Sequence, residues 1–210
     1  MARCRPLFFS AAALLLLGGA HRALAQIEVT PRVGAYLPMG TLLAETDSAS
    51  GATVKRRQVG TLLVGVGLSA GLSERIGLQA AISLAPSQIA ITTTRSTRDV
   101  GAAVVLGNLR GIYYLTPRSG RLGLHVGTGI GLIERLGGPW RDVAGTTDLG
   151  LASSIGGRGG VVDGIRYTFE LEHYMTWVGF NDVEPVSETS GRIHHDVLLS
   201  LGLVITVADR

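Results

Sequence analysis

The sequence predicts an all-β protein, an eight-stranded antiparallel up-and-down β-barrel that spans a membrane. Three observations lead to this prediction. Eight segments alternate aliphatic residues with polar or small ones, which is the pattern of strands that expose two different faces. The links between these segments alternate between short and long. After residue 25, the chain has no run of roughly 18 apolar residues that would cross a membrane as a helix.

The first 25 residues have the pattern of a secretory signal peptide. Arg3 and Arg5 form a positive n-region, residues 7–19 are apolar, and Ala23-Leu24-Ala25 is a small-residue cleavage motif. The apolar run is too short to cross a hydrocarbon core of roughly 30 Å as a helix. We therefore expect residues 1–25 to be removed and residues 26–210 to form the barrel. A retained anchor helix is the alternative.

Removal of the signal peptide leaves a mature chain without net formal charge. Residues 1–25 carry three of the 19 basic residues and none of the 16 acidic ones, so 16 of each remain. This balance gives no support for a nucleic-acid partner. The single cysteine, Cys4, leaves with the signal peptide, which excludes disulfides, thiolate metal sites and a cysteine nucleophile. We find no cofactor, metal or catalytic motif in the rest of the chain.

The strand pattern is clearest near the C-terminus. In residues 193–207 the odd positions are aliphatic apart from His195, and the even positions are mostly polar or small. The predicted strands, in order, are residues 27–37, 61–72, 76–85, 100–116, 121–133, 149–155, 165–177 and 193–207. The sixth has the weakest alternation. Most of them reach the roughly 9–11 residues that a tilted strand needs to cross a membrane.

The lengths of the links between the predicted strands also indicate a membrane barrel. Three of them are short, at residues 73–75, 117–120 and 156–164. The other four are longer and polar, at residues 38–58, 86–99, 134–147 and 181–191. Barrels of the outer membrane have this asymmetry, with tight periplasmic turns and long external loops.

Alternation alone does not decide which face is buried, so a soluble barrel is the alternative to a membrane barrel. The polar face consists mostly of Gly, Ser, Thr and Ala with a few charges, which suits a narrow interior. A solvated exterior would be rich in Lys and Glu, yet Lys55 is the only lysine. We therefore expect the aliphatic face to contact outer-membrane lipids. Two aromatic belts would then flank it: Tyr113, Tyr167 and Phe169 at the periplasmic end, and Tyr36, Trp177 and Phe180 at the external end.

These features resemble the small bacterial outer-membrane β-barrel superfamily, the relatives of OmpA-type transmembrane domains. The resemblance covers the whole mature chain in its strand pattern. Residues Ser200 to Val207 resemble the signal through which the barrel-assembly machinery recognises a last strand, although the usual terminal aromatic residue is replaced by Ala208-Asp209-Arg210. The resemblance implies a location in the bacterial outer membrane and recognition by that machinery.

Five ionisable residues on the polar face form the candidate site. Counted from a common periplasmic level, Arg32, Arg110, His125, Glu170 and Glu172 lie at similar heights and point inward. Charges in a narrow interior of low dielectric constant must pair. The sequence therefore predicts a luminal ion-pair cluster. It would act either as a gate in a pore or as a plug, and the plug is favoured because eight strands leave room for little more than side chains.

No other motif points to chemistry as clearly. His194, His195 and Asp196 suggest a metal or base site, but neighbouring strand residues point to opposite faces, so His194 and His195 cannot bind one ion together. No local Ser–His spacing indicates a lipid acyl hydrolase or transferase. We expect a structural or loop-mediated interaction role without enzymatic activity. A narrow channel for small solutes and an envelope lipid-modifying enzyme are the alternatives.

Overall fold

The structure is a computed structural model that describes residues 26–40, 42–46, 53–118, 120–140, 146–162, 165–178 and 192–208. The predicted signal peptide, the link at 181–191 and Phe180 lie outside these residues. The elements are β1 (Gln26–Met39), β2 (Leu43–Thr46), β3 (Thr53–Gln58), β4 (Thr61–Gly71), β5 (Ile76–Thr92), β6 (Thr97–Tyr114), β7 (Leu122–Gly137), the 3-10 helix η1 (Gly138–Trp140), β8 (Thr147–Val162), β9 (Ile165–Val178) and β10 (Arg192–Ala208). Among the described residues, no helix is long and apolar enough to cross a membrane.

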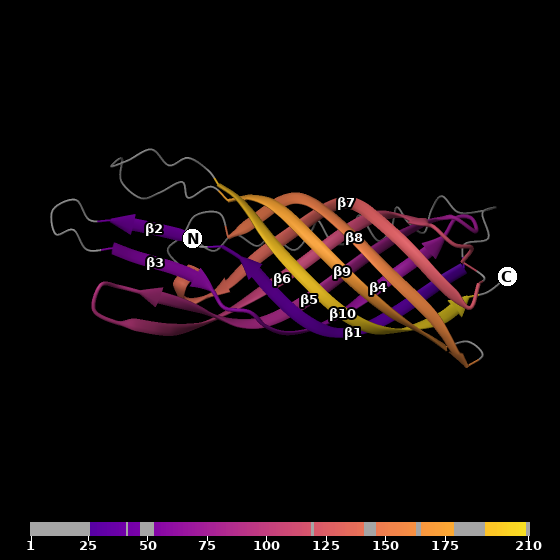
Figure 1. The fold of residues 1–210 in the computed structure, drawn as a ribbon, viewed down its shortest axis with the longest axis horizontal. Helices are drawn as coiled ribbons and strands as arrows, with labels where there is room; N and C mark the ends of the chain where they lie inside the picture. The colour runs from indigo at the N-terminus through magenta and orange to yellow at the C-terminus, as the bar shows by residue number, and fades with distance from the viewer. Residues whose placement is uncertain are drawn as a thin grey trace, which may run out of the picture.

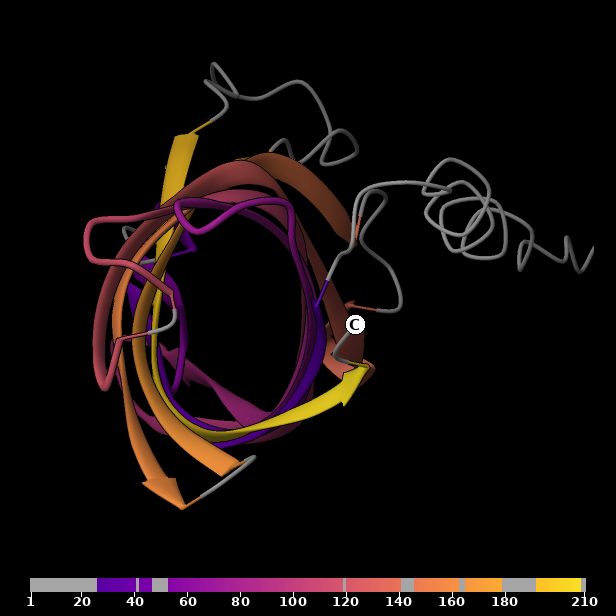
Figure 2. The ribbon, with the colours of Figure 1, turned by 90° about the vertical axis from the view of Figure 1, so that its right-hand side faces the viewer.

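Eight of the described strands close into an antiparallel barrel. They pair in the order β4, β1, β10, β9, β8, β7, β6, β5, and β5 pairs with β4 to complete the ring (Figures 1 and 2). The first and last strands of the barrel, β1 and β10, are neighbours over most of their length. Closure leaves no unpaired edge, which is the only way for a sheet to satisfy its backbone hydrogen bonds inside a membrane. The predicted eight-stranded antiparallel architecture is confirmed.

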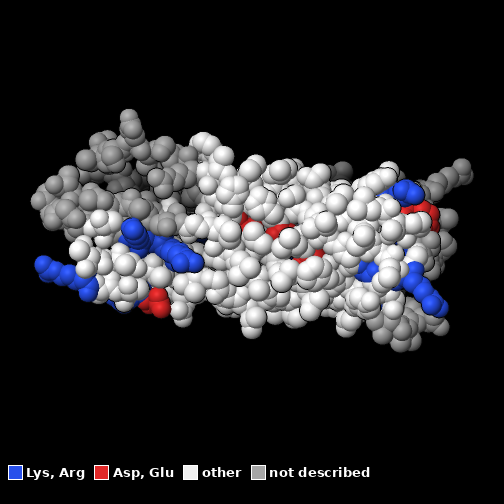
Figure 3. Space-filling view, viewed as in Figure 1, with Lys and Arg blue, Asp and Glu red and all other residues white. Residues whose placement is uncertain are grey.

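The two faces of the barrel differ as the alternation predicts. On β10, Leu199, Leu201 and Leu203 are exposed on the outside, whereas Leu198 and Ser200 are buried inside. The same outward aliphatic wall continues around every strand of the barrel. In water, an apolar surface of this extent would drive aggregation, but in a lipid bilayer it is the expected solvent-facing surface. On the face shown in Figure 3, Lys and Arg lie only toward the two ends.

Beyond the barrel, β5 and β6 continue as a long hairpin, and this differs from the predicted loop at 86–99. The two strands pair from Ile76–Tyr113 to Thr92–Thr97, and only residues 93–96 form the turn. Within the predicted loop at 38–58, β2 and β3 form a second hairpin that pairs with β5. These segments escaped the strand prediction because they stand outside the lipid, where neither face needs to be aliphatic. We call β2, β3 and the projecting ends of β5 and β6 the external extension (Figure 1).

Strand β8 is also longer than predicted. Its glycine-rich half, residues 156–160, has the composition of a turn, yet β8 pairs with β7 as far as Gly159 and with β9 as far as Val162. The glycines leave space for large neighbouring side chains. A Cβ atom on Gly156 would lie 2.5 Å from Nε2 of His125. In a narrow barrel, glycine within a strand thus makes room for inward side chains rather than ending the strand.

The positions of the aromatic residues agree only in part with the prediction of two aromatic belts. Tyr113, Tyr167, Phe169 and Trp177 are exposed on the outer face. Tyr36, in contrast, is fully buried inside the barrel, so its assignment to the external belt is wrong. Tyr36 belongs to the residues of β1 that alternate toward the inside of the barrel. A strand residue cannot move to the other face without a change of register, so Tyr36 points inward.

The outward assignment of Leu201 yields a stability prediction. The substitution Leu201→Arg should lower the free energy of unfolding by about 2–4 kcal/mol in lipid vesicles, because it places a charge in the hydrocarbon core. Val207→Arg, on the same face near the end of β10, should cost only about 0–1 kcal/mol. Denaturant unfolding of the two variants in one lipid measures the difference. Equal losses would contradict a membrane-spanning outer face.

Candidate functional site

The five predicted luminal residues lie together in the middle of the barrel. Arg32 on β1 forms an ion pair with Glu172 on β9 and lies 3.7 Å from Glu170 (Nη1 to Oε2). Arg110 on β6 lies 3.0 Å from Glu170 (Nη2 to Oε1) and 3.7 Å from Glu172 (Nη2 to Oε2). Nε2 of His125 on β7 lies 3.7 Å from Oε1 of Glu170. All five are buried, and we call them the central cluster.

Strand β5 supplies further partners to the two arginines. Arg32 donates a hydrogen bond from Nη2 to Oγ of Ser83 at 2.8 Å. Arg110 donates from Nη2 to Oε1 of Gln79 at 2.9 Å. Neither residue was predicted to belong to the site, although both lie on the inward face of their strand. Guanidinium groups that meet both carboxylates and neutral acceptors are held in one position, so the cluster has little freedom to open.

Glu172 is also held by two neutral donors. Asn108 on β6 donates from Nδ2 to Oε2 of Glu172 at 3.0 Å and to the hydroxyl of Tyr174 at 2.6 Å. The Tyr174 hydroxyl in turn donates to Oε2 of Glu172 at 3.1 Å. Ion pairing and these hydrogen bonds together offset the desolvation of a carboxylate that has no exposed surface.

A second cluster fills the external end of the lumen. Arg135 on β7 forms an ion pair with Asp148 on β8, and its Nη2 lies 3.8 Å from Oδ2 of Asp196 on β10. The Tyr36 hydroxyl donates to Oδ1 of Asp196 at 2.7 Å, and Nε2 of His194 lies 3.4 Å from the same oxygen. We call these residues the external cluster. His194 and Asp196 therefore belong to the packing of the lumen, while His195 points outward.

A third cluster closes the periplasmic end. Arg118, in the turn between β6 and β7, folds back so that its Nη2 lies 2.9 Å from Oε1 of Glu28 on β1. Arg158 on β8 lies 3.4 Å from Oε2 of Glu28 (Nη1), and its Cζ lies 4.6 Å from the centre of the Tyr114 ring. Arg158 and Arg166 both donate to the carbonyl oxygen of Arg118, at 3.2 and 2.8 Å. We call these residues the periplasmic cluster.

An apolar layer separates the central cluster from the external one. It contains the fully buried residues Leu63, Leu106, Ile133 and Leu198, together with smaller neighbours. Its position follows from its two tyrosines, because Tyr174 bonds to the central cluster and Tyr36 to the external one. Apolar side chains packed across a narrow lumen exclude water and ions. This layer was not predicted.

Little space remains in the described part of the lumen. A cavity of about 30 Å³ lies between the central and periplasmic clusters, where Glu28, Tyr114, His125, Arg158 and Glu170 line it. A volume of this size holds no solute larger than water. The ribbon in Figure 2 encloses a ring, but buried inward side chains fill it. In its described residues the lumen is therefore a plug of three ion clusters and one apolar layer.

The periplasmic cluster was not predicted. Arg118 and Arg158 lie in segments that the sequence predicts to be turns, where strand alternation does not say whether a side chain points inward or outward. The structure brings them to Glu28 because one turn folds beneath the barrel and because β8 continues through its glycines. The only feature of the sequence that points to Arg118 and Arg158 as members of a cluster is their charge, and charged residues occur in many turns.

Comparisons with known proteins agree with this architecture. No protein-family model matches the sequence, and no curated protein matches it. Among solved structures, OprG from Pseudomonas aeruginosa matches with a TM-score of 0.62 at 10% identity, over 87% of this chain and 97% of that one. Neisserial surface protein A matches with a TM-score of 0.53 at 12% identity, over 86% and 96%. Outer membrane protein W from E. coli matches with a TM-score of 0.52 at 12% identity, over 88% and 99%.

These similarities concern the fold. The three neighbours are bacterial outer-membrane proteins, and this chain shares their small transmembrane β-barrel. The expected relation to the small outer-membrane barrels is confirmed at this level. Identities of 10–12% carry no information on what the barrel binds or does.

The central cluster yields a second stability prediction. The substitution Glu172→Gln should lower the free energy of unfolding by about 3–5 kcal/mol, because it leaves buried arginine charge without its partner. Glu134→Gln, at a half-exposed outward position on β7, should change it by less than about 0.5 kcal/mol. Denaturant unfolding in detergent or lipid gives both values. A loss for Glu172→Gln as small as that of Glu134→Gln would mean that the cluster is hydrated.

Proposed function

We propose that this protein is an outer-membrane barrel that acts through the surface it presents outside the membrane, and not as a solute channel. The observation that carries the proposal is the plugged lumen. A solute would have to pass three ion clusters and an apolar layer whose residues are linked across the barrel by hydrogen bonds and ion pairs. Opening this path would leave several buried charges without partners, at a cost of several kcal/mol.

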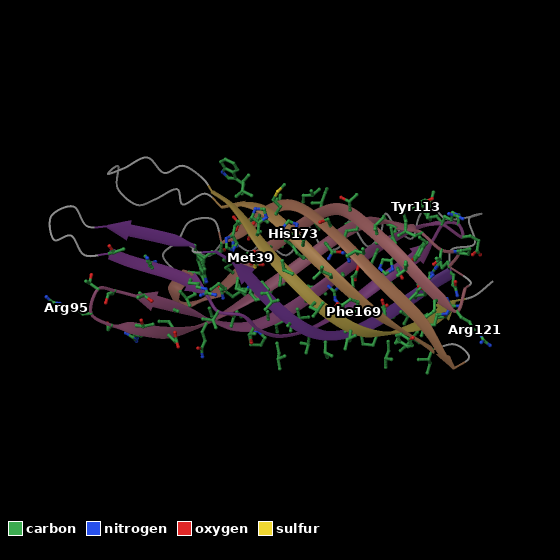
Figure 4. The ribbon with its side chains drawn as sticks, in the orientation of Figure 1. Met39, Arg95, Tyr113, Arg121, Phe169 and His173 are labelled. Carbon is green, nitrogen blue, oxygen red and sulfur yellow. The ribbon has the colours of Figure 1, made fainter. Side chains whose placement is uncertain are left out.

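The external extension offers the surface for such a role. Residues 43–46, 53–58 and 89–100 contain five basic residues and two acidic residues, Glu45 and Asp99. Four of the basic side chains are exposed: Lys55, Arg57, Arg95 and Arg98. Arg95 lies at the tip of the β5–β6 hairpin (Figure 4), and Lys and Arg side chains lie at this end of the molecule as well as at the opposite end (Figure 3). Because the long connections of this fold lie outside the cell, the extension presents positive charge there.

The extension is held firmly to the barrel. Leu42, Ile89 and Trp140 form a buried apolar cluster at its base, with Ile91 and Ala102 packed against it. Nε2 of Gln58 on β3 donates to Oγ of Ser87 on β5 at 2.9 Å. A rigid base keeps the charges in a constant arrangement, which lowers the entropic cost of binding a partner.

The partner that fits this surface is the anionic headgroup layer of the outer leaflet. Each Lys or Arg near an anionic membrane surface contributes about 1 kcal/mol of attraction. The extension projects from the external end of the barrel, where it meets that layer, so no diffusing partner is required (Figure 1). In this proposal the protein stabilises the envelope by binding acidic headgroups and has no enzymatic activity. The barrel-assembly machinery is the further partner we expect, through Ser200 to Val207 on β10.

The plugged lumen predicts an absence of conductance. The purified barrel in a planar lipid bilayer should show no steady current steps in monovalent salt, because the apolar layer and the ion clusters exclude hydrated ions. Heat-modifiable migration in unboiled gels serves as the control that the protein is folded. Reproducible current steps from the folded wild-type barrel would contradict the proposal and favour the narrow channel.

The basic extension predicts binding to anionic lipid. The folded protein in phosphatidylcholine nanodiscs should bind phosphatidylglycerol vesicles at low salt and phosphatidylcholine vesicles much more weakly. Replacement of Lys55, Arg57, Arg95 and Arg98 by Gln should weaken the binding by about tenfold or more, because four attractive charges are lost. The matched control replaces Arg75 and Arg121, exposed at the opposite end of the barrel, by Gln. Equal losses in the two variants would contradict a role for the extension.

A further inference from the structure

The outer wall of the barrel carries one group of nitrogen and sulfur donors near its external end. His195 on β10 lies directly opposite Met39 on β1 and Met175 on β9 in the sheet register. His173 precedes Met175 by two residues, so it lies on the same face of β9. Met39, Met175 and His195 are exposed, and His173 is half-exposed. Figure 4 shows Met39 and His173 at the same end of the barrel, away from Tyr113.

Among the described residues, this group contains both methionines and both histidines of the outer wall. Met39 and Met175 are the only methionines among the described residues. The other described histidines, His125 and His194, face the lumen. Imidazole side chains are unusual on a wall that faces lipid, because water solvates them better than lipid does. The four residues come from three strands and are neighbours only because β10 lies between β1 and β9.

The two histidines already hold their ring nitrogens close together. Nε2 of His173 lies 2.9 Å from Nδ1 of His195, and the rings are nearly parallel, with an angle of 10° between their planes. One ring donates the proton and the other accepts it. Metal–imidazole bonds of about 2.0–2.1 Å in a tetrahedral site separate two nitrogens by about 3.3 Å. When a metal ion takes the place of the shared proton, that proton moves to the other ring nitrogen of the donating histidine, so both ligands stay neutral. The rings would need to open by only a few tenths of an ångström.

The methionines are placed to complete the coordination. Directly opposed residues on antiparallel strands have Cβ atoms about 4.5–5.5 Å apart, which places both methionines beside His195. Three rotatable bonds let a methionine side chain bring its sulfur to a neighbouring site. Trp177, exposed on the same face two residues beyond Met175, marks the level of the membrane interface. Ions from the external solution can therefore reach the patch.

We propose that Met39, His173, Met175 and His195 form a binding site for a soft monovalent metal ion, Cu(I) or its analogue Ag(I). Thioether ligands select soft ions, and imidazole is compatible with them. The four ligands are neutral, so a monovalent ion brings a single charge to the edge of the lipid. Zn²⁺ or another divalent ion would bring two charges without a carboxylate or thiolate from these residues to balance them.

The test uses the folded, processed protein in detergent micelles. Titration with Ag(I), and with Cu(I) under reducing conditions against a colorimetric chelator, should give one equivalent of tightly bound metal. The methyl resonances of Met39 and Met175 should both shift in proportion to the metal added. The variants Met39→Leu, Met175→Leu, His173→Leu and His195→Leu should each weaken binding by at least about tenfold, because losing even an outer partner that orients a ligand costs about 10–100-fold.

Leucine is the common residue of this wall, so these variants are expected to fold, which migration in unboiled gels verifies. Tyr167→Leu and Ile193→Leu, two outward positions on β9 and β10, are the matched controls and should bind metal as the wild type does. Binding that survives both methionine substitutions, or that is equally strong for Zn²⁺, would reduce the site to a histidine pair and overturn the proposal. An absence of methyl shifts at one equivalent of Ag(I) would overturn it as well.

Discussion

Closure of the sheet between β1 and β10 is the constraint on which the rest of this structure depends. A bilayer offers no water to unpaired backbone groups, so a sheet that crosses it must have no edge. Once eight strands close, the interior has a fixed and small cross-section. Every inward side chain must then pack against others across the lumen, and every inward charge must find its partner there. The ion pairs among Arg32, Arg110, Glu170 and Glu172 are a consequence of that confinement.

The interior reverses the usual arrangement of a protein core. Charged and polar residues fill two ends and the centre of the lumen, and the apolar layer around Leu106 and Ile133 is a minor part of it. Buried ion pairs contribute little net stability compared with apolar packing, because desolvation offsets their attraction. They do make the arrangement specific, since pairs in the centre and at the periplasmic end join strands that are distant in sequence: β1 to β9, β6 to β9 and β1 to β8. A shift in register would separate the partners.

One pair of strands, β5 and β6, connects the plug to the surface proposed for function. Within the barrel, β5 supplies Gln79 and Ser83 to the central arginines, and farther along it carries the base and the tip of the external extension. Along the length of the β5–β6 strand pair, the surroundings change from lipid to water. The side chains change accordingly, from an aliphatic outer face to the exposed Arg95 and Arg98 at the external end. The metal site we propose lies near the boundary between these two surroundings.

The sequence by itself determined the alternation, and with it the eight barrel strands, the outward aliphatic wall and the five inward ionisable residues of the central cluster. These features depend only on the two-residue period of a strand, which is local. The contacts between strands depend on register and on the tilt of the closed barrel, which no single segment contains. Only the tertiary structure therefore brought Arg118 and Arg158 to Glu28, placed Tyr36 against Asp196, and set His195 between Met39 and Met175. It also turned two predicted loops into paired strands, because backbone hydrogen bonds to a neighbouring strand leave no mark on the pattern of side chains.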